Sequence, residues 1–281
     1  MITLNAHAKI NLSLDVLNKR EDGYHTLQMI MQSIQLHDTI SIHEIPSGVE
    51  INCEAPYVPN NSSNIAYKAA EAMINRYNIT SGVRIEVEKR IPVAAGLAGG
   101  STDAAAVIKG MNELFKLGAG PAELMQLGKT IGADIPYCII GKTALAEGIG
   151  EKLTPLAPFG NIPILLVKPR IGVSTAWVYK NFRLDKVLGK PDTSLLIKAI
   201  EAGDIRTVAL NMRNVLESVT LKKYAIIDKI KTDLVEAGAL GSMMSGSGPT
   251  VFGIFEDRKT AESAFNKLGN SKHECILTYT V

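Results

Sequence analysis

The feature that most constrains the fold of this chain is a run of small residues between a predicted strand and a predicted helix. Residues 83–89 alternate between apolar and charged side chains, which is typical of a half-buried strand. The run 94–100 consists of alanine, glycine and one leucine, and an apolar periodicity from about Ser101 to Leu117 predicts a helix. Glycine and alanine let the backbone approach an anion closely, and the first N–H groups of a helix favour negative charge. The sequence therefore predicts a strand–loop–helix unit that can bind a phosphate group.

A simpler interpretation of the same loop is close packing against a sheet, with Ser101 or Thr102 as an ordinary helix N-cap instead of a hydroxyl for phosphate or Mg²⁺. Short glycine patterns recur by chance, so glycine content alone does not decide between the two. The loop is not a P-loop, because no Gly-Lys-Ser/Thr ends it, and it lacks the dinucleotide-binding spacing. The HRD and DFG signatures of protein kinases are also absent from the sequence. A phosphate site here must belong to another architecture.

The composition is that of a soluble globular protein. Apolar residues make up 46% and charged residues 21% of the 281 residues, and this length suits two domains or one large one. Thirty Lys and Arg against 28 Asp and Glu give a net charge of +2, so no strong field attracts nucleic acid or anionic lipid. We therefore expect no nucleic-acid partner and no membrane partner, and the near-neutral charge permits a monomer or a homodimer.

The cysteines and the N-terminus indicate the compartment. Cys53, Cys138 and Cys275 lie far apart and outside any CxxC spacing, so we interpret them as small core residues in a reducing compartment. The first residues lack the pattern of a signal peptide, and no apolar run approaches the roughly 20 residues of a membrane span. Histidines and cysteines form no zinc spacing. These features predict a cytoplasmic protein without a metal site built from its own side chains.

The order of the predicted elements favours an α+β fold, because strands and helices are mixed without strict alternation. Before a Pro- and Gly-containing break at 153–160, we expect strands at 3–17, 28–45 and 49–54, a helix at 64–77 and a helix opened by Pro121. After the break we expect strands at 162–168, 250–256 and 273–280, helices across 175–237, and a helix at 258–268. This order predicts two domains, 1–157 and 158–281.

Four segments of the chain carry a family resemblance. Residues 92–106 and Gly132–Pro136, with the Ser245–Thr250 segment, resemble the motifs of the galactokinase, homoserine kinase, mevalonate kinase and phosphomevalonate kinase (GHMP) superfamily. The N-terminal stretch Ala8–Leu14, followed by the Arg-Glu-Asp-Gly-Tyr-His-Thr-Leu motif at 20–27, is similar to the signature of the 4-diphosphocytidyl-2-C-methyl-D-erythritol kinase family. The four segments lie in family order along the chain.

The resemblance implies a two-domain α+β GHMP kinase fold. Its ribosomal-protein-S5-like N-terminal domain (1–157) would bind ATP and carry out catalysis, and its ferredoxin-like C-terminal domain (158–281) would bind substrate. The implied reaction is ATP-dependent phosphorylation of the 2-hydroxyl of 4-diphosphocytidyl-2-C-methyl-D-erythritol, in the non-mevalonate isoprenoid precursor pathway. The alternatives are a sister kinase for homoserine or mevalonate and a non-catalytic ligand-binding protein on the same scaffold. Tyr24 and His25 argue against the sister kinases, because those substrates have no base to stack.

The resemblance assigns Lys9 and Asp134 as the catalytic pair. A carboxylate can accept the proton of an attacking hydroxyl, and a nearby ammonium lowers the carboxylate's pKa and stabilises charge on the transferring phosphoryl group. Without the resemblance, a turn aspartate bonded to its own backbone and a lysine facing solvent or a carboxylate are the simpler interpretations. Asn11 shares a strand face with Lys9, so it would bind substrate or be an ordinary amide of an edge strand.

The resemblance also assigns the cytidine pocket. Tyr24 would stack on the cytosine and His25 would bind its polar edge, with Thr175 and Tyr179 as the second wall. Without the resemblance, His25 would be interpreted as a surface histidine with its hydrogen bonds made. Tyr179 would be interpreted as a core residue at helical spacing. Ser247 and Gly248 would lie near the diphosphate, and the simpler interpretation is a tight hairpin between strands 240–244 and 250–256.

The predicted cofactor-binding residues lie either on the small-residue loop or at the start of a helix. Asn64 and its neighbour Ile65 would border the adenine or simply cap the helix at 64–77. Asp103 would interact with the dipole of its helix in the first turn. Mg²⁺ should accompany ATP, held by phosphates and water, because the Glu ligand of several superfamily members cannot be placed here. The loop residues are Pro92, Val93, Ala94, Ala95, Gly96, Leu97, Ala98, Gly99, Gly100, Ser101 and Thr102.

Overall fold

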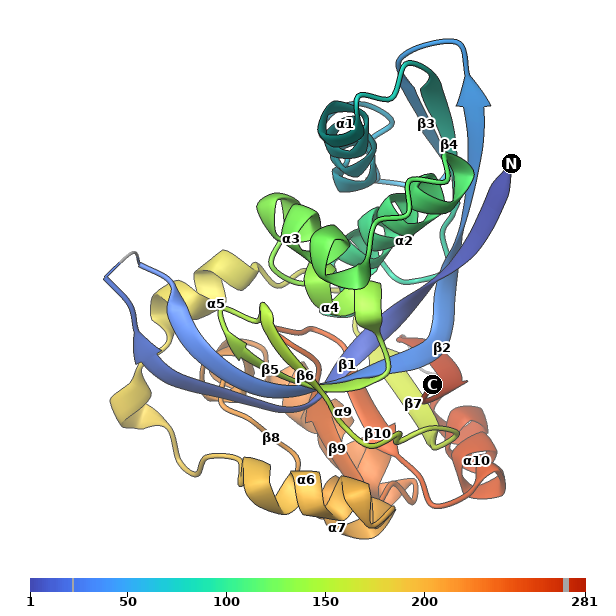
Figure 1. The fold of residues 1–281 in the computed structure, drawn as a ribbon. Helices are drawn as coiled ribbons and strands as arrows, with labels where there is room; N and C mark the ends of the chain where they lie inside the picture. The colour runs from blue at the N-terminus through green and yellow to red at the C-terminus, as the bar shows by residue number, and fades with distance from the viewer. Residues whose placement is uncertain (22, 270–272) are drawn as a thin grey trace. The chain divides into compact units, whose positions relative to one another are not determined.

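A computed structural model describes residues 1–21, 23–269 and 273–281, so Asp22 of the 20–27 motif lies outside the described residues (Figure 1). The chain forms two compact units, and neither is continuous in the sequence. The first unit comprises Met1–Ala8, Leu36–Val93 and Ala98–Gly141. The second unit comprises Lys9–Gln35, Ala94–Leu97 and Lys142–Val281. The strands β1 (Ile2–Lys19) and β2 (His25–Ile45) each begin in one unit and end in the other.

The first unit contains a small sheet and the helices α1 to α4. Residues 39–45 of β2 pair antiparallel with β4 (Gly82–Glu88), and β3 (Val49–Cys53) pairs parallel with β4. The alternation predicted for β4 is confirmed, because its apolar side chains are buried and its charged ones are exposed. The helices are α1 (Ile65–Tyr77), α2 (Gly99–Leu114), α3 (Pro121–Ile131) and α4 (Ile135–Ile140).

Helix α2 lies close to the sheet of the first unit. A Cβ atom on Gly110 of α2 would lie 2.5 Å from Ile42 Cδ1 and 2.7 Å from Leu4 Cδ1. Only glycine allows the helix to come this near to the two strands, so this contact fixes the distance between α2 and the sheet of the first unit.

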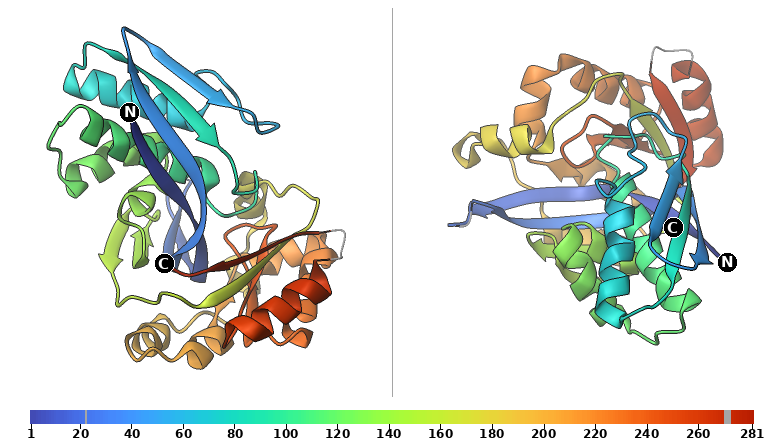
Figure 2. Two further views of the ribbon diagram at one scale, coloured as in Figure 1. Left: turned by 90° about the vertical axis from the view of Figure 1, so that its right-hand side faces the viewer. Right: turned by 90° about the horizontal axis from the view of Figure 1, so that it is seen from above.

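The second unit contains a four-stranded antiparallel sheet in the order β11-β7-β10-β9 (Figures 1 and 2). Helix α9 packs against β9 and β10, and α10 packs against β7 and β11. These elements are β7 (Pro163–Lys168), β9 (Gly241–Met244), β10 (Val251–Ile254), β11 (Glu274–Tyr279), α9 (Ala225–Glu236) and α10 (Arg258–Leu268). The strands and the helix predicted for this region are therefore confirmed.

The rest of the second unit consists of short elements. A hairpin of β5 (Thr143–Gly148) and β6 (Lys152–Pro155) pairs with β2 at Leu27–Gln32, and it was not expected from the sequence. The helices and the two-residue strand β8 between β7 and α9 are α5 (Thr175–Asn181), the 3₁₀ turn Leu184–Lys186, α6 (Thr193–Glu201), α7 (Ile205–Asn211), β8 (Arg213–Asn214) and α8 (Glu217–Lys223). β8 pairs parallel with β1 at Ser13 and Leu14.

Two sequence expectations need correction. Helix α2 begins at Gly99 and ends at Leu114, where residues 101–117 were expected. Left-handed residues bound it, with Ala98 at φ 59° before it and Lys116 at φ 50° after it. Cys275 is half-buried and so is not a core residue, whereas Cys53 and Cys138 are buried thiols. Among the described residues, no helix has the length and apolar character needed to cross a membrane.

Candidate active site

Lys9 lies on β1 in the second unit, and its side chain is buried. The residue is only 5% exposed, so the expectation of a solvent-facing lysine is wrong. Its Nζ donates a hydrogen bond to Asn11 Oδ1 at 2.8 Å. Within its own unit, Lys9 has no carboxylate partner among the residues described. A buried ammonium with so little compensation is costly, and a bound anion would offset that cost.

Asn11 holds the Lys9 ammonium from the same face of β1. It is fully buried, and its Nδ2 donates to Met29 Sδ at 3.4 Å while its Oδ1 accepts from Lys9. It is therefore not an exposed amide on an edge strand. A direct contact between Asn11 and a substrate stays a prediction.

The central part of the small-residue loop, Ala94–Leu97, belongs to the second unit and lies on the turn after β9. Gly96 has φ +76°, and a Cβ atom there would overlap the carbonyl oxygen of Ser245. Ser245 Oγ in turn donates to the Gly96 carbonyl oxygen at 3.0 Å. The backbone N–H of Lys9 donates to the Leu97 carbonyl oxygen at 3.2 Å. The loop is therefore held against both β1 and the turn, and only glycine suits position 96.

The end of the loop, in the first unit, leads directly into α2. Ala98 is the N-cap in the left-handed region, with no side-chain hydrogen bond to the first turn. The expectation that Ser101 or Thr102 caps the helix is wrong, because the helix already begins at Gly99. Thr102 is buried, and its Oγ1 donates to the His7 carbonyl oxygen at 2.7 Å. Its hydroxyl thus anchors α2 to β1, and the uncapped N–H groups of the first turn suit an anion.

A buried ion cluster that the sequence did not predict lies beside the start of α2. Lys89, directly after β4, contacts the carboxylates of both Asp38 and Asp103, the latter at 2.7 Å. All three side chains are at most 8% exposed. A Cβ atom on Gly99 would lie 3.0 Å from Lys89 Nζ. Asp103 is in the second turn of α2, so its partner is this lysine and the expected dipole contact in the first turn is wrong.

The cluster shifts the pKa values of its members. Burial opposes the charged form of Lys89, but the carboxylates of Asp103 and Asp38 outweigh it and raise the pKa of Lys89. Burial raises the pKa of Asp103 well above its ordinary value, and Lys89 offsets this only in part. The only signal in the sequence was a charged residue within a strand pattern, with Asp38 inside the predicted strand 28–45 and Lys89 at the end of 83–89.

Asp134 lies in the first unit, at the residue before α4. It is half-buried, and its side chain makes no capping hydrogen bond to that helix. The simpler interpretation of a turn aspartate bonded to its own backbone is therefore wrong. Lys9 belongs to the second unit, so the pairing of Lys9 with Asp134 stays a prediction.

Three aromatic side chains gather at the start of β2 and on α5 in the second unit. The ring of His25 lies 5.4 Å from the ring of Tyr179, tilted by 31°, and 6.2 Å from Phe182, edge to face. Burial, and then the charge of Lys19, lower the pKa of His25, which keeps the imidazole neutral at neutral pH. Tyr179 is half-buried beside His25 and is not a core residue, and Tyr24 is 63% exposed. The sequence did not predict Phe182, although it follows Tyr179 at helical spacing.

The turn between β9 and β10 connects the remaining predicted residues. Met244 and Val251 are paired across the hairpin, so the predicted hairpin is confirmed. Ser247 Oγ and Thr175 Oγ1 are 2.7 Å apart, which ties the turn to the start of α5. Gly248 has φ +88°, in the left-handed region.

Asn64 is the N-cap of α1, as the simpler interpretation predicted. Its Oδ1 accepts from the backbone N–H of Ala66 at 2.9 Å, and its Nδ2 donates to the Pro59 carbonyl oxygen at 2.8 Å. A Cβ atom on Gly100 would lie 3.2 Å from Ile65 Cγ2, so the starts of α1 and α2 are neighbours. A place for these residues beside adenine stays a prediction.

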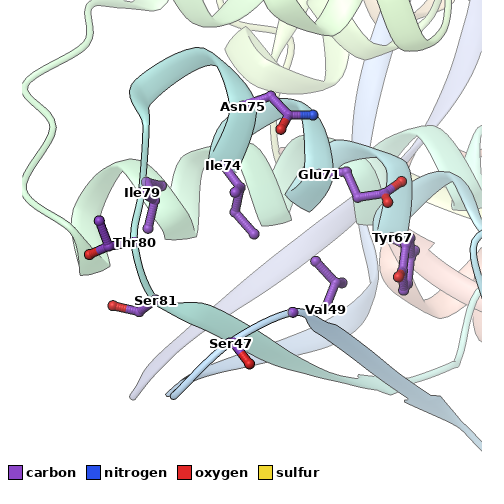
Figure 3. A pocket seen from close by; sticks show the side chains of 10 residues that line it. Ser47, Val49, Tyr67, Glu71, Ile74, Asn75, Ile79, Thr80 and Ser81 are labelled. Carbon is purple, nitrogen blue, oxygen red and sulfur yellow. The ribbon is translucent and has the colours of Figure 1, made fainter.

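Two further observations on the described residues concern metal binding and a pocket. No three His, Cys, Asp or Glu side chains among them are grouped closely enough to hold a metal ion. A pocket of about 330 Å³ lies in the first unit, on α1 and the turns next to it (Figure 3). None of the predicted site residues lines it, and its lining consists of Ser47, Gly48, Val49, Tyr67, Glu71, Ile74, Asn75, Ile79, Thr80 and Ser81.

Comparisons with known proteins give matching family models and relatives. The family models for the GHMP kinases N terminal domain and the GHMP kinases C terminal domain match residues 64–142 and 196–274. A protein of Acetivibrio thermocellus named 4-diphosphocytidyl-2-C-methyl-D-erythritol kinase is 61% identical over 280 residues, which are 100% of this chain and 99% of that protein. A protein of the same name from Clostridium botulinum is 53% identical over 280 residues, with 100% of each chain covered.

The solved structures give the same result. A crystal structure of 4-(cytidine 5'-diphospho)-2C-methyl-D-erythritol kinase has a TM-score of 0.86 at 31% identity and covers 99% of each chain. A homoserine kinase from Cytophaga hutchinsonii has a TM-score of 0.72 at 16% identity, covering 98% of this chain and 94% of its own. The second similarity shows the fold alone.

Proposed function

Because this chain belongs to the GHMP kinases, and among them to the 4-diphosphocytidyl-2-C-methyl-D-erythritol kinase family, we propose that it phosphorylates 4-diphosphocytidyl-2-C-methyl-D-erythritol with ATP. The acceptor is the 2-hydroxyl of the methylerythritol moiety, in the non-mevalonate isoprenoid precursor pathway. Full-length identity of 61% to a relative of that name supports the reaction. The observation that carries the choice of acceptor is the ring pair of His25 and Tyr179, because homoserine and mevalonate have no base to stack.

The aromatic site of the second unit would bind the cytosine. Stacking on a ring such as Tyr179 or Tyr24 tolerates any base, so hydrogen bonds must select it. A neutral imidazole both donates and accepts a hydrogen bond, and the lowered pKa of His25 favours that form. The Thr175 and Ser247 hydroxyls, 2.7 Å apart, would lie near the diphosphate together with Gly248.

The loop at 92–102 and the uncapped start of α2 would hold the ATP phosphates. Lys9 would stabilise the charge on the transferring phosphoryl group, and its burial without a carboxylate in its own unit supports a bound anion there. Asp134 would act as base, since its carboxylate makes no capping hydrogen bond. The assignment of ATP binding and catalysis to 1–157 and of substrate binding to 158–281 is part of the same proposal.

Mg²⁺ fits this site as an ion held by phosphate and water. The described residues offer no group of three His, Cys, Asp or Glu side chains, and Mg²⁺ commonly keeps several waters beside one or two carboxylates and the substrate phosphates. When bound, it supplies neutralisation of charge on the transferring group. A cytoplasmic location and a monomeric or homodimeric state remain predictions.

Release of ADP by the purified protein tests the proposal. The assay uses Mg-ATP with 4-diphosphocytidyl-2-C-methyl-D-erythritol, homoserine or mevalonate, and includes the Asp134→Asn variant. We expect turnover only with the cytidylated acceptor and its loss in the variant. Turnover on another acceptor would overturn the assignment of Tyr24 and His25. No turnover on any acceptor by folded protein that binds ATP would indicate a non-catalytic binding protein.

A further inference from the structure

Asn214, on the short strand β8, is a buried amide with every hydrogen-bonding group in use. The residue is 5% exposed. Its Nδ2 donates to two carbonyl oxygens of the second unit, that of Met244 at 2.8 Å and that of Gly246 at 2.7 Å. Its Oδ1 accepts from the backbone N–H of Leu216 at 3.0 Å. No other side-chain type of this size supplies two donors and one acceptor, so the position requires asparagine.

These hydrogen bonds join β1 to the turn after β9. Asn214 pairs with Leu14 of β1, and the backbone N–H of Val215 donates to the Leu14 carbonyl oxygen at 3.0 Å. Lys9 is on the same strand, five residues before Leu14. The carbonyl oxygens of Met244 and Gly246 belong to the end of β9 and to the turn. One side chain therefore couples the strand that carries Lys9 to the turn.

Helix α8, directly after β8, holds the same turn by two more contacts. Glu217 Oε1 accepts from the backbone N–H of Met244 at 2.8 Å. Thr220 Oγ1 donates to the Ser247 carbonyl oxygen at 3.4 Å. The turn is thus fixed from one side by β8 and α8, with Asn214 at the centre.

The turn held in this way borders both Lys9 and the loop. Gly246 has φ +57°, and a Cβ atom on it would lie 3.6 Å from Lys9 Nζ and 3.3 Å from the Gly96 carbonyl oxygen. Ser245 Oγ donates to that same carbonyl oxygen at 3.0 Å. A shift of the turn would therefore move both the groups around the Lys9 ammonium and the middle of the small-residue loop.

We propose that Asn214 is a positioning residue for phosphoryl transfer, which fixes the 245–248 turn against Lys9 and Gly96. The role rests on the proposed function. Asn214 acts through the turn, because both of its N–H donors are hydrogen-bonded to backbone carbonyl oxygens. Displacement of catalytic groups by about 1 Å is enough to lower turnover about a hundredfold, so a loss of this clamp should appear in kcat.

Two variants and a matched control test the proposal. Asn214→Asp keeps the shape but loses both donors, and Asn214→Leu keeps the size without any polar group. Asn211→Asp is the control, because Asn211 is a half-buried amide three residues away that bonds only the Thr207 carbonyl oxygen of its own helix. For each protein, kcat is measured between pH 6 and pH 8.5, and hydrogen exchange is measured at residues 245–248.

We expect both Asn214 variants to fold, to lose about tenfold or more in kcat at pH 8, and to exchange faster at 245–248. The Asp variant should regain activity relative to wild type as pH falls, because a protonated carboxyl donates one hydrogen bond, and the Leu variant should not. Asn211→Asp should match wild type in kcat and exchange.

Three results would overturn the proposal. The first is kcat within about twofold of wild type although the turn exchanges faster, because the turn's position would then not govern turnover. The second is an unchanged exchange rate at 245–248. The third is failure of both variants to fold, since a residue required by the whole fold is not a positioning residue. Inactivity of the wild type on every acceptor would instead reject the proposed function, and the exchange data would still test the clamp.

Discussion

The two units hold their key backbone segments with opposite chemistry. In the first unit, the ions of Lys89, Asp38 and Asp103 lie beside the start of α2. In the second unit, the neutral side chains of Asn214 and Ser245 hold the turn after β9, together with the Glu217 carboxylate, which accepts from the Met244 N–H. A buried ion cluster of this kind depends on Lys89 and on pH, because loss of the lysine charge leaves two buried carboxylates uncompensated. The hydrogen bonds of Asn214 and Ser245 involve no titratable side chain and depend on geometry, so we expect stability to respond most in the first unit and turnover most in the second.

The largest effect should follow removal of the one cation in the ion cluster. Lys89→Met leaves two buried carboxylates next to each other, so it should lower the free energy of unfolding by about 3–5 kcal/mol. Urea unfolding followed by circular dichroism measures this. The control is Arg90→Met, because Arg90 is 54% exposed and pairs with Glu88 at the surface. It should cost about 1 kcal/mol or less, and an equal loss in both variants would contradict the comparison.

A second prediction concerns Gly96, the residue at which the loop contacts the turn after β9. Gly96→Ala should lower the free energy of unfolding by about 2–4 kcal/mol, from the left-handed φ and from overlap with the Ser245 carbonyl oxygen. It should also reduce kcat. Gly118→Ala is the matched control, since Gly118 has φ +69° with nothing near its Cβ position. The control should show the conformational cost alone, about 1–2 kcal/mol. Equal losses would mean that the loop is not seated on the turn.

A milder change isolates the pH dependence of the ion cluster. The pKa of Asp103 is raised by folding, so the folded protein binds its proton more tightly than the unfolded chain does. The contribution of Asp103 to stability is therefore greatest below its ordinary pKa and is lost as pH rises through the raised value. Asp103→Asn should remove the part of the stability loss at rising pH that comes from Asp103. The variant should be at least as stable as wild type at pH 8. Urea unfolding at pH 5 and pH 8 measures both, and an unchanged pH dependence would contradict the raised pKa.

The smallest effect concerns His25 in the second unit. Its lowered pKa predicts a KM for the cytidylated acceptor that is constant near neutral pH and rises as pH falls below the ordinary histidine value of about 6.5. Lys19→Met removes one cause of the shift and should raise the pKa of His25 by a few tenths of a unit in an NMR titration. Lys229→Met, on the surface of α9, should leave it unchanged. A titration of His25 above its ordinary value in wild type would contradict the neutral imidazole.

Much of the fold follows from local pattern in the sequence. The alternation of 83–89 and the small-residue run after it predict β4, the loop and α2, because a strand face and a helix start are short-range features. The predicted strands of the second unit are found for the same reason. The β5–β6 hairpin was not expected, since Thr143–Gly148 is short and its pairing with β2 is a long-range contact.

The site was predictable where a motif is contiguous and not where partners meet across the chain. The loop and the hairpin turn come from contiguous motifs, whereas His25 and Tyr179 were assigned together by the family resemblance. The Lys89 cluster joins residues that are 51 and 14 positions apart. Asn214 bonds a turn 32 positions away, and nothing in its local sequence distinguishes it from a surface amide. Burial of polar groups is decided by tertiary packing, so these residues required the structure.

Phosphorus NMR of the reaction mixture tests the proposed activity most directly, because ADP release alone does not separate transfer from hydrolysis. The wild-type protein is incubated with Mg-ATP and 4-diphosphocytidyl-2-C-methyl-D-erythritol, beside the Asp134→Asn variant. We expect a new phosphomonoester signal from the acceptor, in addition to its diphosphate signals, and its absence with the variant. Formation of ADP with inorganic phosphate only, or no change in the acceptor's signals, would contradict a kinase of this specificity.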